Sequence, residues 1–236
     1  MLHSPPDLTS TVPVRVSAFS APMLVPLVFA AASQGAAVGL PQGDVTPVTL
    51  LPAAHQYRGG FVVGLSLGAG LGSASGYPNN SQDIGNSAYY SAGGFMAGGY
   101  GQAFVMGALS DYLSFGFWYG HSALRNADWS SNGDGGGFRI ECFPLVGLVP
   151  VLHGLGILAN LGIGSGSLTS TNPSLPEAHG TQSFGGVGLF HEWGFGYGHD
   201  GHFAFGPALE FDAIWSQPFE QHGLVASARL AYYGGP

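Results

Sequence analysis

The side chains of this chain alternate in character with a period of two residues over eight stretches, and this alternation constrains the fold most. The stretches are 60–72, 93–109, 112–124, 137–149, 155–168, 184–197, 202–215 and 223–233. One phase of each stretch is mainly aliphatic or aromatic, and the other is mainly small or polar. Because successive side chains of a β-strand point to opposite faces, each stretch is predicted to be a strand with one apolar face.

The charged residues inside these strands all share the phase opposite the apolar side chains. They form the predicted polar cluster of Arg139, Glu141, Glu192, Glu210, Asp212 and Arg229. An arginine on the lipid-facing side of a barrel costs about 2–4 kcal/mol at the bilayer midplane, so we expect this phase to face a lumen. Eight strands leave a lumen just wide enough for side chains, which predicts that these groups pair with one another. Two arginines against four carboxylates leave an excess of negative charge.

The apolar phase requires lipid outside, because charged residues make up only 8 % of the chain. A typical soluble protein has about 25 %. A membrane-spanning helix needs about 18 consecutive apolar residues, and the longest run, 21–32, is shorter. Each predicted strand, in contrast, reaches the ~9–11 residues that cross a bilayer. The sequence therefore predicts an all-β fold: an eight-stranded, membrane-spanning, up-and-down antiparallel β-barrel.

The predicted connections alternate between short and long. Short ones lie at 110–111, 153–154 and 198–201, and longer polar ones at 73–92, 126–136, 169–183 and 217–222. In an up-and-down meander this alternation places all the long loops on one rim, as outer-membrane barrels do on their external side.

The chain is predicted to have three parts. Residues 1–33 are typical of a signal peptide, because Arg15 precedes the apolar run and the small residues Ala31 and Ser33 fit a cleavage site at its end. Residues 34–57 are predicted to be an extended linker, and residues 58–236 the barrel. Cys142 is the only cysteine, which excludes an intramolecular disulfide. The net charge of −8 without a basic patch argues against nucleic acid as a partner.

Aromatic residues that lie mostly near the predicted strand ends suggest girdles at the membrane interface. They are Tyr112, Trp118, Tyr119, Trp193, Tyr197, Trp215 and Tyr232.

Residues 58–233 resemble the small eight-stranded outer-membrane barrels of the OmpA/OmpX type, especially glycine-rich versions of unassigned function. The resemblance lies in the motif at 60–65, the segment 107–111 and the closing strand 223–232. It implies the bacterial outer membrane, membrane lipid as surroundings, and a last strand that the barrel-assembly machinery reads. The assembly-signal residues would be Leu224, Ala226, Ala228, Leu230 and Tyr232, although Tyr replaces the terminal Phe and three residues follow the strand.

No catalytic, cofactor or metal site is predicted, which favours a structural or surface-interaction role, and the loops hold no motif that identifies an extracellular ligand. One alternative is a barrel-embedded lipid-modifying enzyme that uses His121 and Ser122, although adjacent residues of a strand face opposite sides. Another is a soluble lipocalin-like barrel that binds an apolar ligand inside. The turn with His199, Asp200 and His202 is predicted to be solvated rather than metal-binding, and His191 falls on the lipid-facing phase.

Overall fold

The computed structural model describes residues 58–198 and 200–235, which fold into one antiparallel sheet. The predicted signal peptide (1–33), the predicted linker (34–57) and His199 lie outside the described residues. The strands are β1 (Phe61–Gly76), β2 (Ser91–Ser110), β3 (Leu113–Arg125), β4 (Trp129–Cys142), β5 (Leu155–Ser170), β6 (Ala178–His191), β7 (Trp193–Gly198), β8 (Gly201–Trp215) and β9 (Phe219–Gly234). Two short 3₁₀ turns, η1 (Ser87–Tyr89) and η2 (Pro150–Leu152), interrupt the loops.

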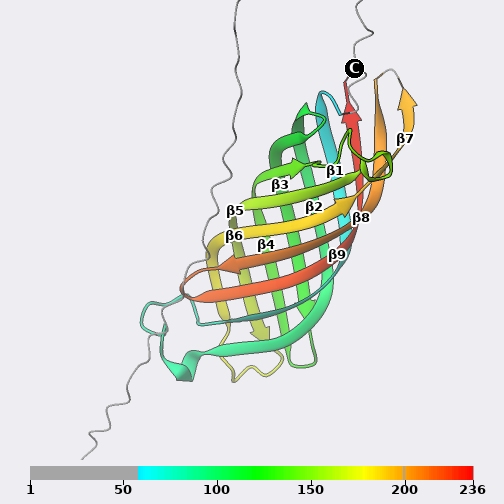
Figure 1. Cartoon of the computed structure of the whole chain (residues 1–236). Coiled ribbons are helices and arrows are strands. Elements are labelled where there is room, and N and C mark those ends of the chain that lie inside the picture. The colour runs from blue at the N-terminus through cyan, green and yellow to red at the C-terminus, as the bar shows by residue number, and fades with distance from the viewer. Residues whose placement is uncertain (1–57, 199, 236) are drawn as a thin grey trace, which may run out of the picture. The chain divides into compact units, whose positions relative to one another are not determined.

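The sheet closes on itself into a barrel (Figure 1). Strands β1 to β6 pair in chain order, β8 pairs with β9, and β9 pairs with β1. β6 and β7 share one position in the ring, because both pair with β8 in a continuous register. Pro207 of β8 falls at the interruption between them, where its missing N–H removes a ladder hydrogen bond. The prediction of an eight-stranded, up-and-down antiparallel barrel is therefore confirmed.

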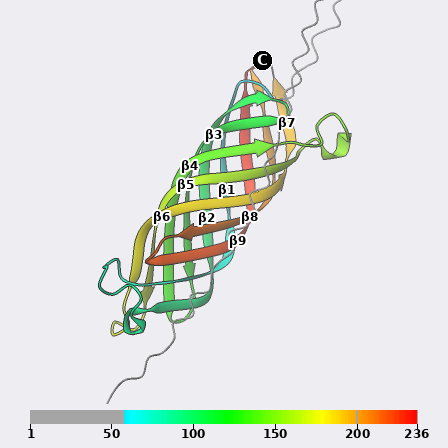
Figure 2. The same cartoon turned by 60° about the vertical axis from the view of Figure 1, so that its left-hand side comes forward.

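The barrel has two different rims. The loop rim carries the connections 77–90, 126–128, 171–177 and 216–218. The terminal rim carries Arg58, the tight turn 111–112, the facing ends of β7 and β8, the loop 143–154 and the C-terminal end of β9. Figures 1 and 2 show the loop 143–154 standing outside the barrel wall beside the terminal rim.

The fourth strand differs from its prediction. β4 begins at Trp129 and ends at Cys142, so residues 143–149 belong to a loop and residues 129–136 to the strand. Two features explain the shift. Residues 130–136 bear no large apolar side chain, yet their backbone pairs with β3 and β5. Past Phe143 the chain contains Pro144, Pro150 and Gly147, whose φ of +79° leaves the strand conformation. The expected alternation of loop lengths is accordingly wrong here: 126–128 is short, and 143–154 is long.

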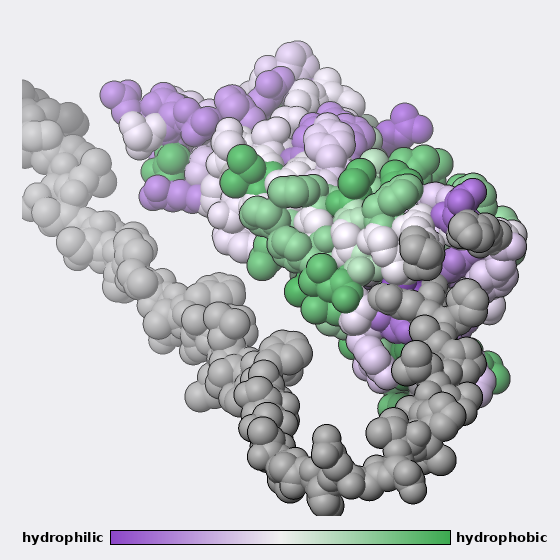
Figure 3. All heavy atoms as spheres, turned by 90° about the horizontal axis from the view of Figure 1, so that it is seen from above, coloured by the Kyte–Doolittle hydropathy of each residue, from purple (hydrophilic) through white to green (hydrophobic). Residues whose placement is uncertain are grey.

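The outer wall is apolar and the interior holds the charges. Outward side chains such as Phe95, Leu67 and Ile163 are 71 %, 68 % and 73 % exposed. Figure 3 shows apolar side chains gathered in the middle of the visible wall, with hydrophilic residues toward its ends. Such an expanse of exposed apolar surface does not suit water, and it matches the lipid-facing band of a membrane-spanning barrel. The lipocalin-like alternative, which needs these side chains inside, is wrong. No helix among the described residues is long and apolar enough to cross a membrane.

Several inward-facing positions are glycines, and the space that their side chains would occupy is filled by another group. A Cβ on Gly64 would meet the ring of Phe104, and one on Gly156 the ring of Phe190. A Cβ on Gly98 would run into the backbone of Ala123, whereas one on the neighbouring, outward-facing Gly99 would meet nothing. The glycine-rich inner phase thus allows a narrow barrel to hold large side chains.

Candidate functional site

The core of the candidate site is a pair of buried arginines that share one carboxylate. Glu141 of β4 accepts hydrogen bonds from Arg229 Nη1 at 2.6 Å and Nη2 at 2.9 Å, and from Arg139 Nε at 2.7 Å. All three side chains have no exposed surface. The Arg229 pair is bidentate, the strong form of a carboxylate contact. Arg139 and Arg229 also lie over the ring of Phe104, 4.7 and 4.3 Å from its centroid.

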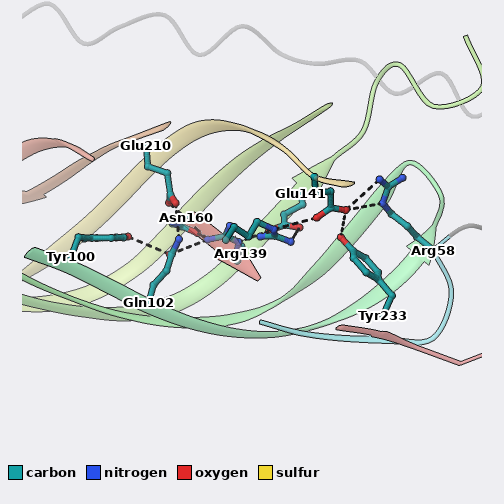
Figure 4. Close-up of polar contacts among 10 residues, drawn as sticks. Arg58, Tyr100, Gln102, Arg139, Glu141, Asn160, Glu210 and Tyr233 are labelled. Carbon is teal, nitrogen blue, oxygen red and sulfur yellow. Dashed lines mark hydrogen bonds and ion pairs between the residues drawn. The ribbon is translucent and has the colours of Figure 1, made fainter. Parts of the chain in front are cut away.

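A second carboxylate, Glu192, closes the network toward the terminal rim. It stands between β6 and β7 and accepts hydrogen bonds from Tyr233 Oη at 2.6 Å and Arg229 Nε at 3.3 Å. Its other cationic partner is Arg58, whose Nε and Nη2 both lie 3.3 Å from Glu192 Oε1. Figure 4 shows Arg58 and Tyr233 converging at this end of the network.

Sequence patterning missed Arg58 as a lumen residue because it precedes the first strand and belongs to no alternation. Its guanidinium lies 3.6 Å from the centre of the Phe143 ring and donates to the carbonyl of His153 at 3.0 Å. Its backbone N–H donates to Asp111 Oδ1 at 2.6 Å. These contacts tie the start of the barrel to two connections of the terminal rim and cap the lumen there.

The third carboxylate, Glu210 of β8, lies toward the middle of the barrel. Glu210 Oε1 accepts from Gln102 Nε2 at 2.7 Å, and Gln102 Oε1 accepts from Arg139 Nη1 at 3.0 Å (Figure 4). Arg139 itself is 3.9 Å from Glu210 Oε2. With Arg58 included, three arginines stand beside three glutamates, and Asp212 is the surplus carboxylate. The excess negative charge is therefore smaller than the sequence suggested.

Asp212 is buried and lines a cavity of about 30 Å³ together with Tyr100, Ser122 and Gln221. This volume suits one or two water molecules rather than a channel. All six members of the predicted polar cluster are thus buried inside the barrel.

Apolar clusters pack among the charges and fill the rest of the lumen. Near the loop rim the cluster contains Ala74, Met96, Leu124, Leu168, Ala178 and Phe219. Near the terminal rim it contains Phe143, Leu158, Phe190 and Ala208. The described lumen is therefore filled by side chains along its length.

One of the seven aromatic residues assigned to the membrane interface is wrong. Trp118 is 4 % exposed and packs inside against Phe184, with ring centroids 4.5 Å apart. The alternation itself indicates this, because Phe117 and Tyr119 occupy the outer phase. Tyr119, Trp193, Tyr197 and Trp215 are exposed on the outer wall, Tyr112 is exposed in the turn before β3, and Tyr232 is partly exposed.

The residues predicted to signal assembly lie on β9, which pairs with both β1 and β8 and closes the ring. Leu224 and Leu230 are exposed on its outer face. The Tyr232 hydroxyl donates to the carbonyl of Asp200 at 2.9 Å.

His121 and Ser122 do not form a catalytic pair. His121 faces outward, where its Nδ1 lies 2.9 Å from Asp134 Oδ1 and where the Tyr119 hydroxyl also donates to that oxygen. Ser122 faces inward and accepts a hydrogen bond from Gln221 Nε2 at 2.9 Å. The barrel wall thus separates the hydroxyl from the imidazole that would have to activate it.

The other histidines do not assemble a metal site in the described part of the chain. His202 is buried with its ring stacked on Tyr233, whereas Asp200 is exposed. His191 lies on the outer wall, as its phase predicts, with Nε2 3.3 Å from the carbonyl of Val151. Within the described residues no group of three or more His, Cys, Asp or Glu side chains could hold a metal ion.

Solved structures that are similar to this chain include three small outer-membrane barrels. Neisserial surface protein A is 12 % identical with a TM-score of 0.41, and the match covers 73 % of this chain and 97 % of that one. Ail, the attachment invasion locus protein of Yersinia pestis, is 8 % identical with a TM-score of 0.41, covering 73 % and 99 %. The N-terminal β-barrel domain of Pseudomonas aeruginosa OprF is 12 % identical with a TM-score of 0.35, covering 73 % and 98 %. No protein-family model matches the sequence, and the comparison with curated proteins gives no match.

Proposed function

We propose that this chain is a bacterial outer-membrane barrel with a structural or surface-interaction role, and that it neither conducts solutes nor catalyses a reaction. The observation that carries the proposal is the filled lumen. Arg58, Arg139 and Arg229 are completely buried among carboxylates and aromatic rings, and apolar clusters fill the space around them. A barrel built in this way offers its partners only its outer wall and its rims.

In this proposal the loop rim faces the outside of the cell, and the terminal rim faces the periplasm. The loops 77–90 and 171–177 are rich in Asn, Ser and Pro and carry the acidic Asp83 and Glu177. Near them the outer wall turns from apolar to polar, as at Asp134 and Glu220. Apart from the short β7, the strands hold 13 to 20 residues. This length is more than a strand needs to cross the bilayer. Because of this excess length, the polar strand ends and loops of the loop rim extend beyond the lipid. An extracellular ligand binds there without entering the lumen.

Two measurements test the proposal. The first is fractionation of the membranes, followed by gel mobility of the unheated and the boiled chain. A closed barrel in the outer membrane migrates differently in the two samples. The second is conductance of the purified chain in planar bilayers, compared with Arg58→Ala. We expect no stable conductance steps from the unmodified chain, and regular steps would contradict a filled lumen.

The proposal that the chain is not an enzyme has its own test. Lipids extracted from membranes that contain the chain, or the double variant His121→Ala and Ser122→Ala, are compared by mass spectrometry. We expect identical profiles. A lipid product that forms only when His121 and Ser122 are present would contradict the proposal and support a lipid-modifying enzyme.

A further inference from the structure

The loop 143–154 on the terminal rim has a composition unlike that of every other connection among the described residues. It holds no charged residue, and its tip reads Val146-Gly147-Leu148-Val149-Pro150-Val151. Leu148 and Val151 are 73 % and 81 % exposed. The loops of the opposite rim are polar, so the apolar character belongs to this segment and not to barrel loops in general.

The loop turns outward instead of crossing the mouth of the barrel. Its first residue, Phe143, is fully buried under Arg58, and the chain then leaves the lumen. Beyond it the loop stands beside the outer wall (Figure 2). One outer-wall contact joins the Val151 carbonyl to His191 Nε2 at 3.3 Å, and Gly147 lies next to the Tyr112 hydroxyl. The exposed apolar tip is thus continuous with the outer apolar wall.

The neighbouring strand sets the level of the loop relative to a bilayer. β7 pairs with β8 along one edge, and no strand among the described residues pairs with its other edge. Hydrocarbon does not tolerate a free sheet edge, so β7 has to lie beyond the hydrocarbon layer. The boundary then falls near His191 and Trp193, the residues at which β6 ends and β7 begins. Because Val151 contacts His191, the loop sits at the same boundary.

We infer that the loop 143–154 is an interfacial anchor that inserts Leu148 and Val151 into the lipid leaflet nearest the terminal rim. This inference rests on the proposed membrane placement of the barrel. Lipid fits better than a protein partner, because the loop has no charge to orient a partner and continues a lipid-facing wall. Anchored in this way, the loop fixes the height of the terminal rim in the membrane.

The test places an environment-sensitive fluorophore at single cysteines of the full chain, in a Cys142→Ser background, reconstituted into phosphatidylcholine vesicles. Val151→Cys reports on the loop. Asn79→Cys, in the exposed loop 77–90, is the matched control for a position in water. Leu67→Cys, on the outer wall, is the control for a position in lipid. Gel mobility before and after boiling verifies that each variant is folded.

We expect the label at position 151 to emit at shorter wavelength than the label at 79. Spin-labelled lipid should quench it several-fold more strongly, and aqueous iodide several-fold more weakly. Equal access of iodide to positions 151 and 79 would overturn the anchor, as would protection of 151 from both quenchers, which indicates a protein contact. Absence of lipid quenching at position 67 would instead contradict the membrane placement of the barrel, so the two failures are distinguishable.

Discussion

Removing the carboxylate of Glu141 tests whether the lumen is a dry, filled interior. The variant Glu141→Ala takes away three hydrogen bonds of 2.6 to 2.9 Å from two arginines that have no exposed surface. Arg139 then keeps Gln102 at 3.0 Å and Glu210 at 3.9 Å, and Arg229 keeps Glu192 at 3.3 Å. Breaking a buried ion pair by removing one partner costs about 3–5 kcal/mol, because it leaves a buried charge without compensation.

That loss is a large part of the total stability of a protein, which is about 5–15 kcal/mol. It lowers the equilibrium constant for folding by roughly two to three and a half orders of magnitude, at about 1.4 kcal/mol per factor of ten. The assay is urea unfolding of the chain in lipid vesicles, followed by tryptophan fluorescence and by gel mobility without boiling. Linear extrapolation to zero urea gives the free energy of unfolding.

Glu177→Ala, in the exposed loop 171–177, is the matched control, and we expect it to change stability by less than about 0.5 kcal/mol. Glu141→Gln keeps one acceptor oxygen but not the charge, and should fall between the two. If Glu141→Ala is within about 1 kcal/mol of the control, the usual value of an exposed pair, water screens the arginines and the lumen is open.

Three further outcomes follow from the interior, each measured by the same urea titration unless stated. Gly98→Ala should cost about 1–3 kcal/mol because its Cβ meets backbone, whereas the adjacent Gly99→Ala, in open space, should be close to neutral; equal effects would contradict the assigned faces. Trp118→Ala should cost about 3–5 kcal/mol and more than the exposed Trp215→Ala, and the reverse order would return Trp118 to the interface. Arg58→Ala, which uncaps the terminal rim and leaves Glu192 with one arginine, should destabilise the barrel by about 3–5 kcal/mol. An unchanged midpoint would show that Arg58 does not hold the rim together.

The alternation of side chains in the sequence determined most of which residues face the lipid and which face the lumen. The six charged residues of the predicted cluster share one phase, and all six are buried in the lumen. Successive side chains of a strand between lipid and lumen point alternately outward and inward. The face of each residue can therefore be assigned from the sequence of its own strand, without knowing which strands lie beside it. The same phase places Trp118, in the middle of β3, inside the barrel, so the prediction that it lies at the membrane interface is wrong.

Only the tertiary structure showed the backbone pairings and ion pairs that join residues far apart in the sequence. Residues 129–136 are a strand because β3 and β5 pair with their backbone, although their side chains show no apolar alternation. Arg58 belongs to the lumen because Glu192, 134 residues later, receives its guanidinium. Residues 143–149 were predicted to end a strand because they are mostly apolar. In the structure, the pairing of β4 with β3 and β5 ends at Cys142, so these residues form a loop. Side-chain alternation is a local property, whereas backbone pairing and charge pairing exist only once the ring has closed.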